Sequence, residues 1–395
     1  MLQQSVLKHI PRHGDGVLEG AAIGFDAAIF QNGDITEVQA VGAMPTCRVP
    51  EGYPLTAGEL AWITAENQLA VKGVFRPAAA QILLVAGMSC PEKVIRREMQ
   101  RLAQFAAQRG CPIVGGNTVH FQDGEELLVQ VVLTANRGQH SLEQSDAPAV
   151  TGRGKASKDP APRPKAGDRV YFLGEVGALG ADLLVKAHRD LLRQRFADSY
   201  IETMEYISEK ERAISPGETG TAGISSTEHA AETFLVKSKA IAALEAGAVF
   251  LHDVSNGGVH AALYQLAEAA GCGIHVRHEG LTIRQSVIEL SEALNINPYL
   301  LLGTGGLLAV VSEEAAETFE KQVAAQSEQE AQVDVTEETI GSTAAKNQSS
   351  FAWSYAGHLT KEKARVITAE SFHMERYLNL PEGDAIDDVI RKAKQ

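Results

Sequence analysis

Residues 251–263 read LHDVSNGGVHAAL, and this stretch decides the fold because it joins two kinds of element through a polar turn. The residues at 248–251 form a short apolar run, as in a buried strand. From Val259 onward, apolar residues recur at helical spacing. The pattern therefore predicts a strand that runs into an amphipathic helix through a turn containing Gly257 and Gly258.

The turn itself allows a functional and a structural interpretation. Gly257 and Gly258 can take backbone angles closed to other residues or let a ligand approach closely, and the helix that follows offers free N–H groups to an anion. In the structural interpretation, Ser255 or Asn256 simply caps the helix. Asp253, just before the turn, is then either a metal ligand or part of the cap.

Strands and helices alternate on both sides of this stretch. In the first half the pattern predicts strands at 21–30, 82–85 and 127–135, and helices at 56–73 and 91–109. The segment CPIVGGNTVHF at 111–121 predicts a strand, a Gly-Gly turn and the start of another strand. In the second half it predicts strands at 168–177, 248–251 and 301–312, and helices near 178–195, 231–246 and 313–326.

The length of 395 residues exceeds what one hydrophobic core usually serves, so two domains are expected. Residues 143–167 are rich in Pro, Ala, Gly and charge, which indicates a linker or surface loop. The expected N-terminal domain is therefore 1–142, and the C-terminal domain is 168–395. Residues 208–230 are polar and rich in Gly, Ser and Thr, which predicts an active-site flap or an inserted loop.

Composition and charge exclude several classes of function. Hydrophobic residues make up 44% of the chain and charged residues 22%, as in an ordinary globular protein. No run of about 18 apolar residues and no apolar leader is present, so we expect a cytoplasmic protein with no membrane partner. A net charge of −14 argues against nonspecific nucleic-acid binding. A small phosphorylated ligand would need local compensation of its charge.

The cysteines give no sign of a zinc site or a disulfide framework. The chain has four of them, without any C-x-x-C pair: Cys47, Cys90, Cys111 and Cys272. Nothing in the sequence marks any of these thiols as reactive. We therefore expect reduced, structural cysteines.

Several motifs together resemble one family. The segments LHDVSNGGVHAALYQLAEAAGCGI and LNINPYLLLGTGGLLAVV are similar to the C-terminal half of the aminoimidazole-ribonucleotide (AIR) synthetase superfamily, and most of all to hydrogenase maturation factor E (HypE). In the N-terminal half, GFDAAIF, ENQLAVKGVFRP and VGGNTVHF resemble the superfamily's motifs in the same order. Selenophosphate synthetase and thiamine-monophosphate kinase are more distant members of this superfamily.

The resemblance implies a two-domain α/β (α+β) fold of the AIR synthase type. The N-terminal domain would pair its sheet with that of a second subunit, giving a homodimer, and the C-terminal domain would be α/β. ATP would bind in the cleft between the domains, with its phosphates held through Mg²⁺ by aspartates, since magnesium prefers oxygen ligands. The implied chemistry activates an oxygen, such as that of a carboxamide, on a small molecule or a carrier protein.

The resemblance also implies which residues bind the cofactor. Carried over position by position, they are Asp26, Asn67, Gly115, Gly116, Asn117, Thr118, Asp253, Ser255, Gly257 and Gly258. Asp253 and Asp26 would be the metal ligands, and His252 would orient the turn. Lys72 and Arg76 lie near the expected phosphate region or are simply surface charges. The resemblance names no catalytic residue.

The chain departs from the superfamily at three acidic positions. Phe25, Gln68 and Asn117 stand where relatives carry an aspartate, and the Thr-Thr-Asp that usually follows the first strand is missing. An amide can coordinate a metal through its oxygen but does not offset cationic charge. We therefore expect a weakened magnesium site.

A further departure lies at the end of the sequence. HypE proteins finish with a reactive cysteine that carries the group to be converted, whereas this sequence finishes with VIRKAKQ. Two functions of different classes stay open. One is an ATP-dependent enzyme with an altered metal site, and the other is a non-catalytic paralogue that serves as a dimeric binding or assembly factor.

Overall fold

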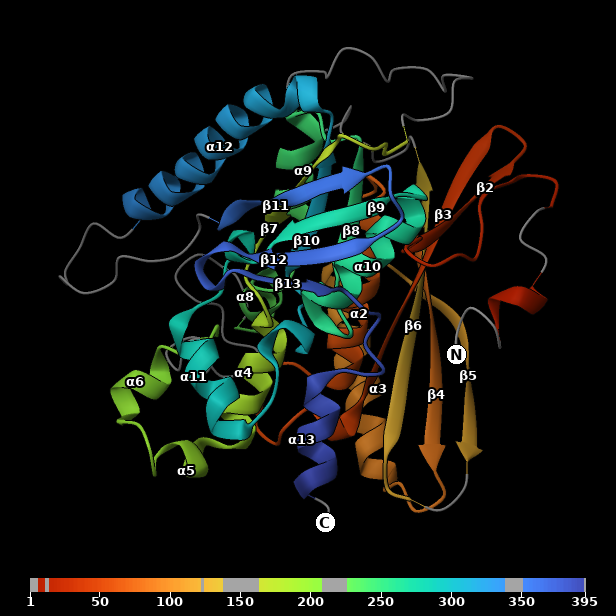
Figure 1. The fold of residues 1–395 in the computed structure, drawn as a ribbon. Helices are drawn as coiled ribbons and strands as arrows, with labels where there is room; N and C mark the ends of the chain where they lie inside the picture. Colours follow the sequence, from red (N-terminus) through yellow and green to blue (C-terminus); the bar gives the residue numbers. More distant parts are fainter. Residues whose placement is uncertain are drawn as a thin grey trace.

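Two β-sheets flanked by helices make up the described part of the chain (Figure 1). The computed structural model describes residues 6–10, 14–121, 124–137, 163–207, 226–337 and 351–393. Most of the predicted linker at 143–167 and of the predicted loop at 208–230 lies outside these described residues. The expected mixed α/β class is confirmed.

Sheet A belongs to the first half of the chain. Its strands are β1 (Val17–Glu19), β2 (Ala27–Asn32), β3 (Ile35–Pro45), β4 (Ala79–Gly87), β5 (Ile113–Phe121) and β6 (Leu127–Arg137). They lie in the order β1-β2-β3-β6-β4-β5, and all neighbours are antiparallel except β4 and β5. Strand β5 is therefore an edge strand, held on one side only.

Sheet B belongs to the second half of the chain. Its strands are β7 (Arg169–Leu173), β8 (Phe250–Val254), β9 (Gly273–Arg277), β10 (Gly306–Val311), β11 (Trp353–Thr360), β12 (Arg365–Ala369) and β13 (Met374–Tyr377). They lie in the order β13-β12-β9-β11-β7-β10-β8, with β9 and β12 as the parallel pair. Strand β8 forms an edge of this sheet. It begins the motif HDVSNGG at 252–258, called the signature motif below, and residues 255–258 after the strand are its signature turn.

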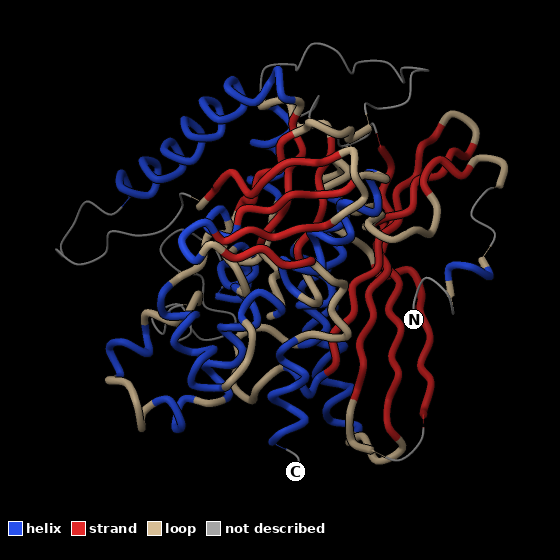
Figure 2. Tube along the Cα trace, viewed as in Figure 1, coloured by secondary structure: helices blue, strands red, loops and turns tan. Residues whose placement is uncertain are grey.

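Helices cover the sheets and fill the space between them (Figure 2). The α-helices are α2 (Ala57–Ala70), α3 (Glu92–Gln108), α4 (Ala178–Ala187), α5 (Arg189–Leu192), α6 (Asp198–Glu202), α8 (Ser226–Glu232), α9 (Lys237–Glu245), α10 (Gly258–Ala270), α11 (Gln285–Leu294), α12 (Ala316–Glu337) and α13 (Ala385–Ala393). The 3-10 turns are η1 (Leu7–His9), η2 (Thr46–Arg48), η4 (His278–Gly280), η5 (Pro298–Leu300), η6 (Glu313–Ala315) and η7 (Glu370–Phe372). No helix in the described part of the chain is long and apolar enough to cross a membrane.

Helix α2 lies at the centre of the molecule. It begins with a capping box in which Thr56 and Glu59 satisfy each other's backbone N–H groups. It is buried on almost every side, as expected of a helix whose residues are apolar or small all round. The core around it contains Leu60 and Trp62 of this helix, Leu183 of α4 and Ile386 of α13. One continuous core therefore joins the two halves of the chain.

Several local predictions differ from the structure: the helix predicted near 178–195 is divided into α4 and α5, and the strand predicted at 301–312 begins only at Gly306. Two further differences concern the predicted site. The Gly-Gly turn predicted at Gly115 and Gly116 is wrong, because both residues lie inside the continuous strand β5. This strand pairs in parallel with β4, with a bulge near Ala80. The predicted strand at 248–251 is shifted, because pairing with β10 carries β8 on to Val254. His252 and Asp253 therefore belong to the strand rather than to the turn.

Candidate functional site

Three predicted residues meet where the start of β2 touches the edge strand of sheet B. His252 and Asp253 lie in β8 and are buried, and Asp26 stands directly before β2. The Nδ1 atom of His252 lies 2.9 Å from Oδ2 of Asp26, and the backbone N–H of Asp253 donates to the same oxygen at 3.3 Å. Asp26 therefore ties the N-terminal half of the chain to the signature strand.

His252 and Asp253 point to opposite faces of sheet B, because consecutive strand residues alternate. His252 faces α10, where its Nε2 lies 3.2 Å from Oε1 of Gln265. Burial alone lowers the pKa of His252, but the charge and hydrogen bond of Asp26 outweigh burial and raise this pKa. Both ring nitrogens are thus engaged, which suits a residue that orients its neighbours.

The Asp253 carboxyl group is in an unusual state. Neither of its oxygens has a hydrogen-bond partner among the described residues, although the residue is only 3% exposed. Burial raises the pKa of Asp253 to about 8, the charge of Asp26 adds to this rise, and His252 opposes it. The Ser255 hydroxyl and the Val254 N–H lie nearby and lower this pKa, but neither forms a hydrogen bond of standard geometry. An unpaired buried polar group costs about 1–3 kcal/mol, so this carboxyl marks a place where a ligand would be stabilised.

A residue that the sequence analysis did not select lies beside this strand. Thr304 is fully buried, and its Oγ1 has no partner in the described ranges of the chain. It stands two residues before Gly306, which lies opposite Val254 in the pairing of β10 with β8. The signal in the sequence was a lone hydroxyl within the apolar and glycine run at 301–308.

The side chains at two other predicted positions are already engaged within the chain. Asn67 donates through Nδ2 to the carbonyl of Phe234 and accepts at Oδ1 from the N–H of Val236, both at 2.9 Å. Oε1 of Gln68 accepts from the N–H of Val41 at 3.3 Å. These amides hold α2 to sheet A and to the segment between α8 and α9.

The structure consequently provides only some of the magnesium ligands that the resemblance implies. Asp26 already gives Oδ2 to two donors, whereas Asp253 keeps both oxygens available. No group of three or more His, Cys, Asp or Glu side chains in the described part of the chain is arranged to hold a metal. Mg²⁺ that accompanies a nucleotide needs only one or two protein carboxylates, with phosphate oxygens and water as the other ligands. The residues present fit that kind of magnesium ion and not a resident carboxylate cage.

The turn after β8 is built around its glycines. Gly257 and Gly258 both have positive φ angles, and Gly257 is the N-cap of α10, without any side-chain cap. A Cβ atom on Gly258 would lie 2.5 Å from the carbonyl oxygen of Tyr299, so no larger residue fits there. The simple cap by Ser255 or Asn256 that the sequence allowed is therefore wrong.

The N–H of Gly257 does not point to open space. It donates at 2.8 Å to Oδ2 of Asp384, a buried residue just before α13. The other oxygen of this carboxylate accepts from the N–H groups of Leu302 and Ile386. No local pattern predicts this contact, because the two residues are 127 positions apart in the sequence.

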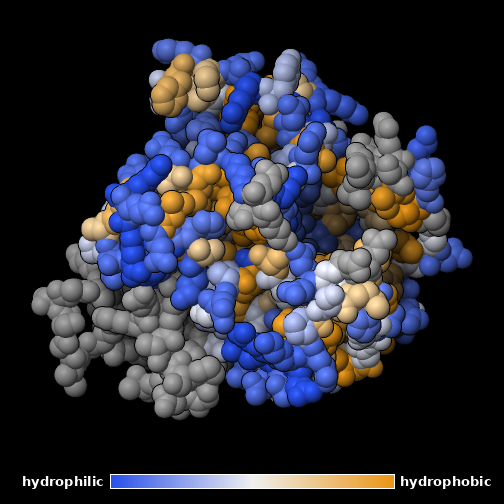
Figure 3. Space-filling view, turned by 90° about the horizontal axis from the view of Figure 1, so that it is seen from below, coloured by the Kyte–Doolittle hydropathy of each residue, from blue (hydrophilic) through white to orange (hydrophobic). Residues whose placement is uncertain are grey.

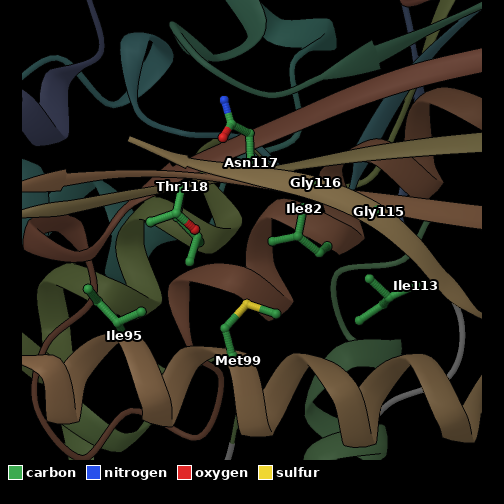
Figure 4. A pocket seen from close by; sticks show the side chains of 9 residues that line it. Ile82, Ile95, Met99, Ile113, Gly115, Gly116, Asn117 and Thr118 are labelled. Atoms are coloured by element: carbon green, nitrogen blue, oxygen red, sulfur yellow. The ribbon is translucent and has the colours of Figure 1, made fainter. Parts of the chain in front are cut away.

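The remaining predicted residues lie elsewhere in the fold. Gly115, Gly116, Asn117 and Thr118 belong to β5, at the outer edge of sheet A and apart from β8 (Figure 1). They border a groove of about 450 Å³ between sheet A and α3, lined also by Ile82, Leu84, Ile95, Met99 and Ile113. Thr118 points into this groove, while Asn117 points to the opposite side of the sheet (Figure 4). One chain alone does not bring these residues next to Asp253.

Lys72 lies beside Phe25, the residue that stands where the resemblance leads us to expect an aspartate. Its Nζ lies 2.7 Å from Oε2 of Glu19 and 5.4 Å from the ring centres of both Phe25 and Phe250. An ammonium over aromatic rings is held by the negative faces of those rings. Phe25 therefore faces a cation of the protein itself. Arg76 is exposed.

The four cysteines form no disulfide bond with one another. Burial raises the pKa of Cys111 to about 11, and it also raises those of Cys90 and Cys272. A raised pKa keeps a thiol protonated and unreactive. Cys47 is exposed.

Comparison with known protein families identifies a match for the second half of the chain. Residues 165–333 match the family described as AIR synthase related protein, C-terminal domain. The matched region includes Asp253 and the turn at Gly257. The second half of the chain therefore carries an AIR synthase-related C-terminal domain.

Among curated proteins, a short stretch of the chain is similar to HypE. It is 36% identical over 64 residues to the carbamoyl dehydratase HypE of Rhodobacter capsulatus, a stretch that covers 16% of this chain and 19% of that protein. The match thus spans about a fifth of the length of the curated relative.

Solved structures show the same fold along most of the chain. A HypE–HypF complex matches with a TM-score of 0.56 at 16% identity, covering 90% of this chain and 93% of that chain. A HypE structure in complex with ATP matches with a TM-score of 0.55 at 15% identity, covering 96% of this chain and 93% of that chain. At these identities the likeness is one of fold.

Proposed function

We propose that this chain binds ATP at the junction of its two halves, with the phosphates next to Asp253. The observation that carries the proposal is the buried Asp253 carboxyl group, which has no hydrogen-bond partner among the described residues. The HypE structure solved with ATP supports this choice of ligand, because that protein has the same fold. A polyphosphate also needs a local cation here, since the net charge of −14 repels it.

Magnesium belongs to this proposal as an ion that arrives with the nucleotide. Asp253 supplies a carboxylate for it, and Asp26 adds at most the oxygen that does not face His252. The phosphate oxygens and water would complete the coordination. Binding of a magnesium nucleotide would also ionise Asp253, because a nearby cation favours the charged form of a carboxyl group.

We also propose that the protein is a homodimer that pairs through sheet A. One face of this sheet packs on α2, but the other is only partly covered, and Val41, Val119 and Phe121 are 48%, 46% and 63% exposed. Val41 lies beside Val132 across β3 and β6, so apolar side chains run across this face. Hydrophobic surface is visible on the side of the molecule where sheet A lies (Figure 3). Apolar side chains gathered on an exposed surface are a feature of protein interfaces.

The proposed reaction is ATP-dependent activation of a carboxamide or a related oxygen in a maturation or biosynthetic pathway of the cytoplasm. The name of the relative, carbamoyl dehydratase, supports a carboxamide substrate. The HypE–HypF complex supports a partner protein, or a group carried on one, as the source of that substrate.

A second candidate function is a non-catalytic binding or assembly factor. It is favoured by the engaged state of Asn67 and Gln68, whose oxygens are used inside the chain. Release of ADP or AMP by the purified protein, measured with each candidate substrate, would favour the enzyme. Nucleotide binding without turnover would favour the assembly factor.

Calorimetric titration of ATP, with and without Mg²⁺, tests the binding proposal. We expect Asp253→Asn to weaken magnesium-dependent binding at least tenfold, because the amide keeps the shape but loses the charge. The matched control is Asp190→Asn, since the side chain of Asp190 is 96% exposed and distant from the site in sequence. Thermal melts would show that both variants stay folded. Equal affinity in Asp253→Asn and the parent would overturn the proposed role of this carboxylate.

A further inference from the structure

The C-terminal segment at 381–393 lies directly on the signature turn. Its Asp384 carboxylate gathers backbone N–H groups from two distant parts of the chain, Gly257 at 2.8 Å and Leu302 at 3.1 Å. It also accepts from Ile386 at 3.0 Å, which closes the first turn of α13. A negatively charged group of the protein therefore occupies the N-terminus of α10, where converging N–H groups and the helix dipole favour an anion.

A second contact fastens the same segment. Arg48 of η2, in the N-terminal half, donates from Nε and Nη2 to both oxygens of Asp387, at 2.8 and 2.7 Å. The Nη1 group of this guanidinium donates to Oδ1 of Asn256, in the signature turn, at 2.6 Å. A bidentate pair fixes geometry as well as charge. Arg48 thus locks α13 onto the turn from the opposite half of the molecule.

We propose that the segment at 381–393 is an autoinhibitory latch that competes with an anionic ligand for the N–H groups of Gly257 and Leu302. In the closed state, seen here, the Asp384 carboxylate fills the anion position. In the open state the segment leaves, and a phosphate group takes the N–H donors and the Arg48 guanidinium. The proposal rests on the proposed function for the identity of the phosphate ligand, but the latch itself is testable with inorganic phosphate.

Opening the closed state breaks one ion pair and uncovers a small number of apolar side chains. Its apolar contacts come mainly from Ala385, Ile386 and Val389 on one face of the short helix α13. The side chain of Asp387 is 38% exposed, so its pair with Arg48 can be broken without exposing the core. A ligand that binds only the open state has its affinity reduced by the fraction of open molecules, so loosening the latch should tighten binding.

Two adjacent aspartates of α13 provide a matched pair of variants. Asp387→Asn removes the charge that holds Arg48, while Asp388→Asn removes the same charge from a residue whose ion pair, within the described ranges, is with Arg391 of its own helix. We expect Asp387→Asn to tighten ATP binding about threefold to tenfold in calorimetry, as the loss of a partly buried ion pair allows. Asp388→Asn should stay within about twofold of the parent. Equal effects of the two variants, or weaker binding in Asp387→Asn, would overturn the latch.

Hydrogen exchange of the full chain reports on the latch directly. ATP, or inorganic phosphate at millimolar concentration, should speed exchange in peptides covering 381–393, and it should do so at lower ligand concentration in Asp387→Asn. If calorimetry shows no ATP binding to any variant, the proposed function fails, while the response to phosphate still decides the latch. Unchanged or slower exchange of 381–393 with both ligands would refute it.

Discussion

Two of the three Gly-Gly pairs in the sequence lie in contrasting surroundings. Gly115 and Gly116 lie on an exposed edge strand, bordering an open groove, whereas Gly257 and Gly258 lie in a packed turn between β8 and α10. Around the first pair the polar groups face solvent. Around the second pair, the Asp384 carboxylate accepts the hydrogen bond of the Gly257 N–H group. The same dipeptide thus serves an open edge in one region and a closed, charged junction in the other.

The largest expected effect separates the two pairs by stability. Gly258→Ala should lower the free energy of unfolding by about 3 kcal/mol or more, because the residue has φ +65° and its Cβ would lie 2.5 Å from a carbonyl oxygen. Gly115→Ala should change it by no more than about 0.5 kcal/mol, since its Cβ would meet open space. Urea unfolding of both variants measures the difference. Similar losses in the two would show that the contrast in packing is wrong.

The second prediction uses pH to sharpen the contrast. The pKa of Asp253 is raised to about 8 in the folded protein, so the native state keeps a proton that the unfolded chain releases. This contribution to stability is full below pH of about 4 and is lost as the pH rises toward 8. Between pH 5 and pH 7 the parent should lose about 2–3 kcal/mol relative to Asp253→Asn. The raised pKa of His252 acts in the same direction at higher pH.

The control for this pH effect comes from the exposed edge. His120 lies on β5 with an exposed side chain, so His120→Gln should keep the pH dependence of the parent. Thermal melts across the pH range give the comparison. A parent whose stability follows the same pH curve as Asp253→Asn would contradict the protonated state of the buried carboxyl group.

The third prediction concerns the uncovered face of sheet A. Phe121→Glu should weaken a homodimer at least tenfold, because burying this ring contributes about 1.5–3 kcal/mol and a carboxylate would oppose burial. Phe372→Glu is the matched control, since Phe372 is 74% exposed on η7, outside sheet A. Light scattering over a dilution series measures both. If the parent protein is monomeric at micromolar concentration, or if the two variants have equal effects, the proposed homodimer is wrong.

The smallest effect is expected from the cysteines, which flank both regions. Cys111 lies just before β5 and Cys272 just after α10. Replacing all four cysteines by serine should leave ATP affinity unchanged. Stability should fall by about 1–3 kcal/mol, mainly from a hydroxyl buried at position 111. Loss of binding in a variant that still folds would reveal thiol chemistry in this protein.

The sequence predicted much of the fold, because local patterns control it. The alternation of strands and helices, the AIR synthase relationship and the helix after Val259 are confirmed. The turn predicted at Gly115 and Gly116 failed for a tertiary reason, since pairing with β4 keeps a continuous strand through two flexible residues.

The candidate site was less accessible from the sequence. Asp26 and His252 are 226 positions apart, so their contact follows from the packing of two halves and not from a motif. The capture of Gly257 by Asp384 is equally non-local. Motif spacing identified Asp253, but only burial in three dimensions gives its carboxyl group an unusual protonation state.

The central position of α2 has a consequence for synthesis on the ribosome. This helix is complete after residue 70, yet it packs in part against α8, α9 and β8, which come much later in the chain. While the chain is still growing, one apolar side of the helix has nothing to pack against. The N-terminal half should therefore stay incompletely folded until most of the protein has left the exit tunnel, and during that interval it is a natural client for a chaperone.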